Sequence, residues 1–229
     1  MKILGLQKTT LLDYPGCVAA TIFLGGCNMR CPFCHNMNLV MDNSGEEYST
    51  EEIFSFLNKR RGILEGVCIT GGEPTLYSDL PKFIREIKNL GYRVKLDTNG
   101  TNPQMLKELI DENLIDYIAM DIKSSSSTYG EVSGVPDINI DNILESINII
   151  MNSGIDYEFR TTVVNEYHSM EVMQDISNMI KGSKKYFLQC FVDSEYVADH
   201  NLTSPDKDTL IKYQNMLCEN IEKVEIRGI

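Results

Sequence analysis

VAATIFLGGCNMRCPFC, residues 18–34, joins a short apolar run to a loop that carries three cysteines within eight positions. The run at 18–24 combines β-branched, aromatic and small residues, which predicts a buried strand. The three thiols then lie just beyond the carboxyl end of that strand. The same arrangement, a strand followed by a chemically distinctive loop, recurs through the chain.

Further apolar runs predict strands, and amphipathic stretches between them predict helices. The strands, some with their following turns, are expected at 66–70, 93–100, 116–124, 157–164, 185–192 and 223–228. The helices are expected at 51–62, capped by Ser49 or Thr50, and at 80–91, 102–114, 141–154, 169–181 and about 204–221. Repeated strand–helix units favour an α/β fold with a parallel sheet, either a barrel or an open doubly wound sheet.

Polar or unusual segments end or follow the first six predicted strands, in the order GGCNMRCPFC, GGEP, DTNG, DIKSS, VVNEYH and VDSE. In parallel α/β folds, ligands bind at the carboxyl ends of the strands. We therefore expect these segments to meet at one site.

Composition excludes several classes of protein. The 229 residues carry a net charge of -12, which disfavours nucleic acid as the main partner. The N-terminal sequence does not resemble a signal peptide, and nowhere do eighteen apolar residues follow one another, so we expect a cytoplasmic protein that does not span a membrane. The odd number of cysteines, seven, does not suggest disulfides in that compartment. Four are expected to be buried as small apolar residues: Cys17, Cys68, Cys190 and Cys218.

Cys27, Cys31 and Cys34 are spaced so that one loop can wrap their thiolates around an inorganic centre. A closed zinc site needs four ligands, and adjacent residues such as Cys34 and His35 rarely bind one tetrahedral ion. A four-iron cluster usually takes four thiolates, so three leave one iron open. A zinc knuckle completed by His168, His200 or a further cysteine is the alternative, although both histidines lie in polar contexts and are expected at the surface.

The cysteine spacing with Phe33 before the last cysteine, followed by TGGEP, resembles the radical S-adenosylmethionine (SAM) superfamily. The longer stretch CNMRCPFCHN, with DTNG and MDIK, resembles its glycyl-radical-enzyme activases. KTTLLDYPG and EFRTTVV are most similar to the activating proteins of anaerobic ribonucleoside-triphosphate reductase. The resemblance runs from about Gly5 to the C-terminus. It implies a partial (β/α)6 barrel, open on one side, as a single domain over residues 1–229 without an auxiliary cluster domain.

The resemblance also implies the cofactors and their ligands. Three cysteines hold a [4Fe-4S] cluster, and SAM binds the fourth iron. A TGGE segment is expected to bind the methionine amino group, and a lysine is expected to bind the carboxylate. An asparagine is expected to contact the adenosine or to help shape the cavity, while an arginine lies near the cofactor or forms a structural ion pair. Aspartates, a threonine and the carbonyl of Ala119 are expected to bind a monovalent cation. The matching residues are Cys27, Cys31, Cys34, Thr70, Gly71, Gly72, Glu73, Asn36, Lys123, Arg160, Asp97, Thr98 and Asp121.

Other interpretations of these residues stay open. Asp97 could cap a helix, and Asp121 could simply pair with Lys123. His35 could tune the cluster or hydrogen bond within its loop. VDSE, at 192–195, falls where these activases complete the nucleoside site, but it lacks the histidine found there in pyruvate formate-lyase activase.

The resemblance implies an enzyme that reductively cleaves SAM to a 5'-deoxyadenosyl radical, which abstracts a hydrogen atom from a glycine of anaerobic ribonucleoside-triphosphate reductase. Flavodoxin or ferredoxin is expected to supply the electron. The alternatives are a radical SAM enzyme acting on another glycyl-radical enzyme or a small molecule, and a non-catalytic iron-sulfur or zinc protein.

Overall fold

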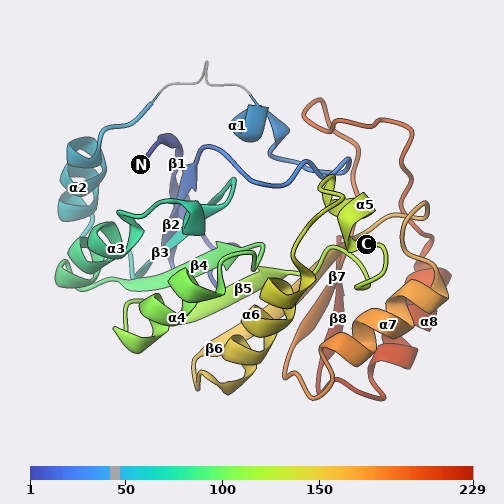
Figure 1. Ribbon diagram of the computed structural model, residues 1–229. Helices are drawn as coiled ribbons and strands as arrows, with labels where there is room; N and C mark the ends of the chain where they lie inside the picture. The colour runs from blue at the N-terminus through green and yellow to red at the C-terminus, as the bar shows by residue number, and fades with distance from the viewer. Residues whose placement is uncertain (42–46, 229) are drawn as a thin grey trace.

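One sheet of eight strands runs through the computed structural model, which describes residues 1–41 and 47–228 (Figure 1). The strands lie side by side in sequence order. The first pairs antiparallel with the second, and every later pair is parallel. The strands are β1 (Ile3–Thr10), β2 (Ala19–Leu24), β3 (Gly66–Gly71), β4 (Arg93–Thr98), β5 (Tyr117–Asp121), β6 (Asp156–Val163), β7 (Tyr186–Cys190) and β8 (Val224–Arg227).

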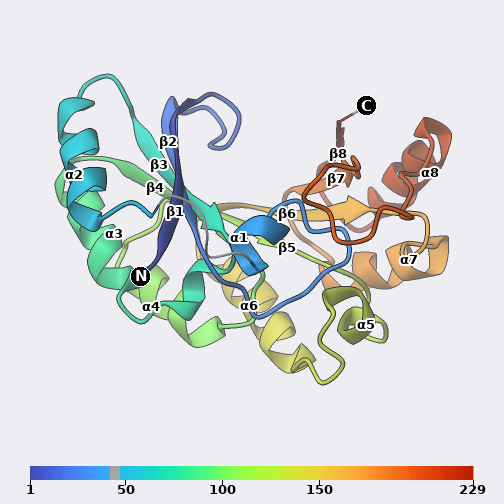
Figure 2. The same ribbon diagram turned by 90° about the horizontal axis from the view of Figure 1, so that it is seen from above.

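Helices follow β2 to β7 and cover the outer face of the curved sheet (Figure 2). Six strand–helix units of this kind confirm the predicted partial (β/α)6 barrel. The sheet stays open, because β1 and β8 are its two outer strands. The covering helices are α2 (Thr50–Lys59), α3 (Leu80–Asn89), α4 (Pro103–Asp111), α6 (Ile140–Asn152), α7 (Met170–Met179) and α8 (Lys207–Leu217).

Local sequence explains where the helices begin. Ser49 is the N-cap of α2, and its side chain accepts a hydrogen bond from the backbone of Glu52 while the Glu52 side chain accepts from the backbone of Ser49. This reciprocal pair satisfies two backbone donors that a helix start leaves free. It also decides between the two predicted caps, Ser49 and Thr50, in favour of Ser49.

Strand β1, the helices α1 and α5, and the 3-10 turn at Pro74–Leu76 were not predicted. Strand β1 pairs only with β2, and its sequence, ILGLQKTT, does not alternate regularly between polar and apolar residues. The helices α1 (Met37–Met41) and α5 (Tyr129–Ser133) have five residues each, too few to show helical periodicity. Helix α5 nevertheless lies beside the cysteine loop, as shown below.

Two predictions about burial are wrong. His168, expected at the surface, is completely buried, because its loop folds back beneath the cysteine loop. Cys218, expected in the core, is exposed just after helix α8. Cys17 and Cys68 are buried as predicted, and Cys190 is half-buried.

Candidate cofactor site

A cavity of about 250 Å³ lies at the carboxyl ends of the parallel strands. Its walls come from the cysteine loop, the turn after β3 and the ends of β4, β5 and β6. Thirteen residues proposed from the sequence line this cavity, namely Cys27, Cys31, Cys34, Asn36, Thr70, Gly71, Gly72, Glu73, Asp97, Thr98, Asp121, Lys123 and Arg160. Ala119, whose carbonyl was expected to bind the cation, is buried within β5 and does not line it. The structure therefore brings the predicted motifs together, although they span 134 residues from Cys27 to Arg160.

The C-terminal end of helix α5 contacts the cysteine loop. The backbone N–H of Arg30 donates to the carbonyl of Ser133 (2.8 Å), and the Cys31 sulfur lies 3.8 Å from the same oxygen. Gly134 ends the helix with φ of +68°, and a Cβ there would lie 2.4 Å from the carbonyl oxygen of Arg30. Only glycine fits both constraints. Neither Ser133 nor Gly134 was identified from the sequence, because the helix that carries them is too short to recognise.

The paired glycines after β3 let two loops approach each other. A Cβ on Gly72 would lie 1.7 Å from the carbonyl oxygen of Gly26, the residue before Cys27. Gly71 has φ of +113°, and a Cβ there would lie 2.3 Å from the oxygen of Leu24. The N–H of Gly72 donates to Leu24 and that of Glu73 to Gly26, both at 2.8 Å. The paired glycines therefore allow the turn after β3 to pack directly against the backbone that leads into the cysteine loop.

Glu73 is fully buried and holds the ends of β3 and β4 together. One carboxylate oxygen accepts from the hydroxyls of Thr75 (2.5 Å) and Thr98 (2.8 Å), and the other accepts from the backbone of Asn99 (2.6 Å). Burial raises its pKa, although these donors partly offset that effect. Glu73 thus fixes the shape of the TGGE turn.

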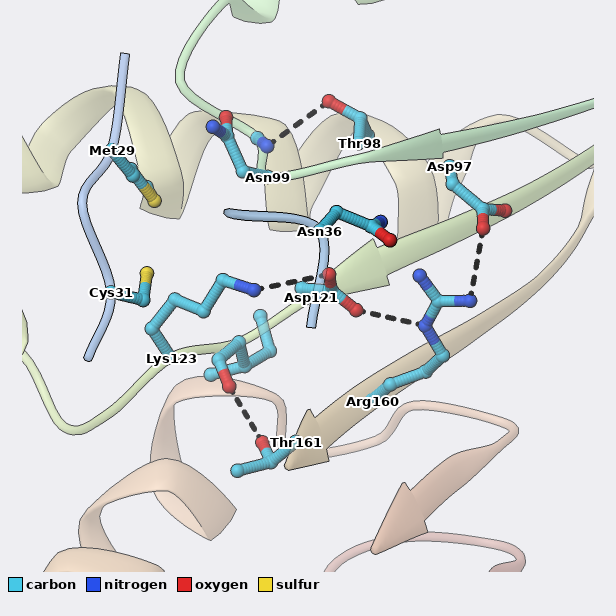
Figure 3. A network of polar contacts seen from close by, with 12 residues as sticks. Met29, Cys31, Asn36, Asp97, Thr98, Asn99, Asp121, Lys123, Arg160 and Thr161 are labelled. Carbon is cyan, nitrogen blue, oxygen red and sulfur yellow. Dashed lines mark hydrogen bonds and ion pairs between the residues drawn. The ribbon is translucent and has the colours of Figure 1, made fainter. Parts of the chain in front are cut away.

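Charged side chains form a connected row across β4, β5 and β6 (Figure 3). Arg160 donates from Nε to Asp121 (2.8 Å) and from a terminal nitrogen to Asp97 (3.2 Å). Lys123 donates to the second oxygen of Asp121 (3.1 Å), and Lys95 pairs with Asp97. Burial alone would raise the pKa values of both aspartates, but Arg160 and the two lysines hold them below their usual value. The pairing of Asp121 with Lys123 is observed, whereas Asp97 caps no helix.

Two asparagines link the motifs. The side chain of Asn36 donates to the carbonyl of Gly71 (3.1 Å), joining the end of the cysteine loop to the TGGE turn. The side chain of Asn99, within DTNG, donates to Asn28 (2.9 Å) and lies 3.8 Å from the sulfur of Cys27. Asn99 was not identified as a site residue, although its place directly after β4 was a signal.

His168 supports the site from within the protein. Its Nδ1 accepts from the backbone N–H of Val164 (3.1 Å), so its Nε2 carries the proton and donates to the carbonyl of Lys123 (3.0 Å). Its ring also meets the edge of Phe33 in the cysteine loop, with ring centroids 6.1 Å apart. His168 therefore connects a site lysine to the cysteine loop.

The cysteine loop fits an iron-sulfur cluster by its donor set, because three thiols of one loop line one cavity. Burial raises the pKa of the Cys31 thiol to about 11, so binding of a metal centre must release its proton. The histidines considered for a zinc site are engaged elsewhere: His168 as described, and His200 with Asp193 at 2.8 Å. In the described part of the chain, no three His, Cys, Asp or Glu side chains are grouped to hold a single metal ion.

Comparison with known proteins identifies the superfamily to which the chain belongs. The sequence model of the radical SAM superfamily matches residues 21–178, and the chain belongs to that superfamily. Its cofactors are accordingly a [4Fe-4S] cluster and SAM. The fold is shared with Streptococcus suis SuiB bound to SAM, at a TM-score of 0.68 and 15% identity, over 91% of this chain and 52% of that one.

Within the superfamily, the chain groups with the glycyl-radical enzyme activating enzymes. It is 32% identical to a Methanocaldococcus jannaschii protein provisionally named as such an enzyme, over 98% of this chain and 95% of that protein. It is 26% identical to the pyruvate formate-lyase-activating enzyme of Clostridium pasteurianum, over 79% of this chain and 76% of that protein. No helix in the described residues is both long and apolar enough to cross a membrane.

Proposed function

We propose that this protein activates anaerobic ribonucleoside-triphosphate reductase by installing a glycyl radical. A [4Fe-4S] cluster held by Cys27, Cys31 and Cys34 would supply one electron for the cleavage of SAM to methionine and a 5'-deoxyadenosyl radical, which would take a hydrogen atom from a backbone glycine of the partner. The products are 5'-deoxyadenosine and a glycyl radical. The observation that carries the proposal is the convergence of the cysteine loop, TGGEP, DTNG, MDIK and EFR on one cavity.

The KTTLLDYPG segment supports this choice of partner by its position. Its residues Leu11, Leu12, Asp13 and Pro15 line a second cavity of about 710 Å³ inside the open barrel. The second cavity shares Thr70, Asp97, Arg160 and Gln189 with the first. The segment that resembles the reductase activases therefore lines a cavity that adjoins the cofactor site, which suits a substrate that belongs to another protein.

The side chains around the cavity have separate tasks in this proposal. Lys123 would bind the SAM carboxylate by a charge-assisted hydrogen bond. The turn of Thr70, Gly71 and Gly72 would bind the methionine amino group with its backbone, while the buried Glu73 holds the turn in shape. Asn36 would contact the adenosine, and Arg160 orders the two aspartates beside it.

The electron comes from outside the chain, with flavodoxin or ferredoxin as the donor. Only three of the seven cysteines share one cavity, and the other four lie apart from them. One cluster in a single domain of residues 1–229 is therefore proposed. A cytoplasmic location belongs to the same proposal, because free thiols persist in reducing compartments.

The test mixes the anaerobically reconstituted, reduced protein with SAM and a candidate reductase. We expect an electron paramagnetic resonance signal of a glycyl radical, with 5'-deoxyadenosine formed in proportion. The Cys31→Ala variant is the matched control and should give neither. Cleavage of SAM without a glycyl signal would favour another glycyl-radical enzyme or a small molecule as substrate. A colourless protein with stoichiometric zinc would refute the radical chemistry altogether.

A further inference from the structure

The carboxylate oxygens expected to bind a monovalent cation already have protein partners. Asp97 accepts from Arg160 at 3.2 Å and from the Thr70 hydroxyl at 3.1 Å on one oxygen, and pairs with Lys95 on the other. Asp121 accepts from Arg160 at 2.8 Å on one oxygen and from Lys123 at 3.1 Å on the other. Each of the four oxygens thus meets a cationic side chain.

Thr98, the other expected side-chain ligand, faces away from these oxygens. Its hydroxyl donates to Glu73 at 2.8 Å and accepts from the backbone N–H of Gly100 at 3.1 Å. The side chain is buried, so it cannot turn toward a cation without breaking both bonds. The expected side-chain ligands, Thr98, Asp97 and Asp121, therefore do not converge on one point.

The charge balance also disfavours a metal cation. Lys95 and Arg160 carry two positive charges that balance the two negative charges of Asp97 and Asp121, and Lys123 supplies a further positive charge for the SAM carboxylate. Lys95 is only 2% exposed and Arg160 only 14%, which means that water screens an added charge weakly. A metal ion would add an unbalanced positive charge and would separate a buried guanidinium from its carboxylates.

The shape of the arginine side chain suits the bridge. Arg160 reaches Asp121 with Nε and Asp97 with a terminal nitrogen, so one planar guanidinium spans the ends of two neighbouring strands (Figure 3). A lysine ammonium is a single point donor and does not offer this fixed fork. Arg160 also lies in register with Asp121 on the adjacent strand, which holds the guanidinium in place.

We infer that Arg160 replaces the monovalent metal ion in this protein: its guanidinium bridges Asp97 and Asp121, and SAM binding does not require Na⁺ or K⁺. Lys123 then remains the cation directed at the SAM carboxylate. Arg160 is a positioning residue in this arrangement, because it acts through the two aspartates.

Equilibrium dialysis of SAM against the reconstituted protein tests this role without any partner protein. At equal ionic strength, the dissociation constant in Na⁺, K⁺ and choline should agree within about twofold. In choline, Arg160→Met should weaken binding by about tenfold or more, and added Na⁺, K⁺ or guanidinium should restore part of the loss. The matched control is Arg85→Met, which removes an exposed arginine paired with Glu112 and should change neither affinity nor cation response.

A second measurement detects a cation site directly. Titration with Tl⁺, followed by ²⁰⁵Tl NMR, should show no saturable binding to the wild-type protein. Saturable Tl⁺ binding that Na⁺ displaces, or a wild-type affinity that falls about tenfold in choline, would overturn the inference. Neither result needs a variant, so the test remains decisive if Arg160→Met fails to fold. Neither result would affect the proposed activation of a reductase, which is read from the glycyl signal.

Discussion

Gly72→Ala should destabilise the protein and impair cluster assembly together. The new Cβ would lie 1.7 Å from the carbonyl oxygen of Gly26 and 2.5 Å from its carbon. Both atoms belong to backbone, so no side chain can rotate away. The two loops must separate by more than 1 Å, which breaks the 2.8 Å hydrogen bond from Glu73 to Gly26. Overpacking costs about 1–3 kcal/mol and the lost hydrogen bond about 1 kcal/mol, so we expect a loss of about 2–4 kcal/mol.

Urea denaturation of the cluster-free protein measures this loss, and iron and sulfide analysis after reconstitution measures assembly. Iron content should fall because Gly26 directly precedes Cys27, so a displacement of Gly26 also displaces the Cys27 thiol. Gly5→Ala is the control: its Cβ would meet only the side chain of Phe23, at 3.3 Å, and should change stability by less than about 1 kcal/mol. A Gly72→Ala protein with full iron content and stability within about 1 kcal/mol of wild type would refute this account of the paired glycines.

Three further predictions concern single side chains. Cys31→Ala should abolish cluster assembly, whereas Cys68→Ala, at a buried thiol outside the cofactor cavity, should keep full iron content; a four-iron cluster in the former would contradict the ligand assignment. Lys123→Met should weaken SAM binding about tenfold in equilibrium dialysis, and unchanged affinity would contradict its role. Burial lowers the pKa of His168, so its imidazole binds a proton more tightly in the unfolded chain than in the folded protein. The contribution of neutral His168 to the free energy of unfolding should be fully present above about pH 6.5, and should decrease as the pH drops from there toward the folded-state pKa. Urea denaturation at about pH 7.5 and 5.5 should show a smaller loss in His168→Gln than in wild type, with His200→Gln matching wild type.

The sequence predicted the covered strands and helices well because each carries a strong local signal. Strands β2, β3, β5 and β7 are mostly apolar runs, as expected of strands buried on both faces. Strands β4 and β6 instead alternate apolar residues with polar ones, several of which line the second cavity. Strand β1 lies at the edge, and α1 and α5 are single short turns of helix, so none of the three has a periodic pattern long enough to recognise. Local sequence patterns do not predict an element that forms mainly because of its contacts with neighbouring elements.

The site was predictable as a set of motifs but not as a set of contacts. Each motif follows a strand, and parallel strands end at one edge, so convergence could be inferred before any coordinates. Lys95 lies within β4 and gave no sign that its ammonium would be buried beside Asp97. His168 is surrounded in sequence by polar residues and became a core residue only because its loop packs under Phe33.

The sequence alone determined which chemical groups are available: three closely spaced thiols, a pair of glycines, and acidic and basic residues at strand ends. Their partners were decided by the tertiary structure. Arg160 is 63 residues from Asp97 and 39 from Asp121 along the chain, yet it binds both. Ion pairing depends on the separation of side chains in space and on how little water lies between them, and neither quantity is encoded by spacing along a chain.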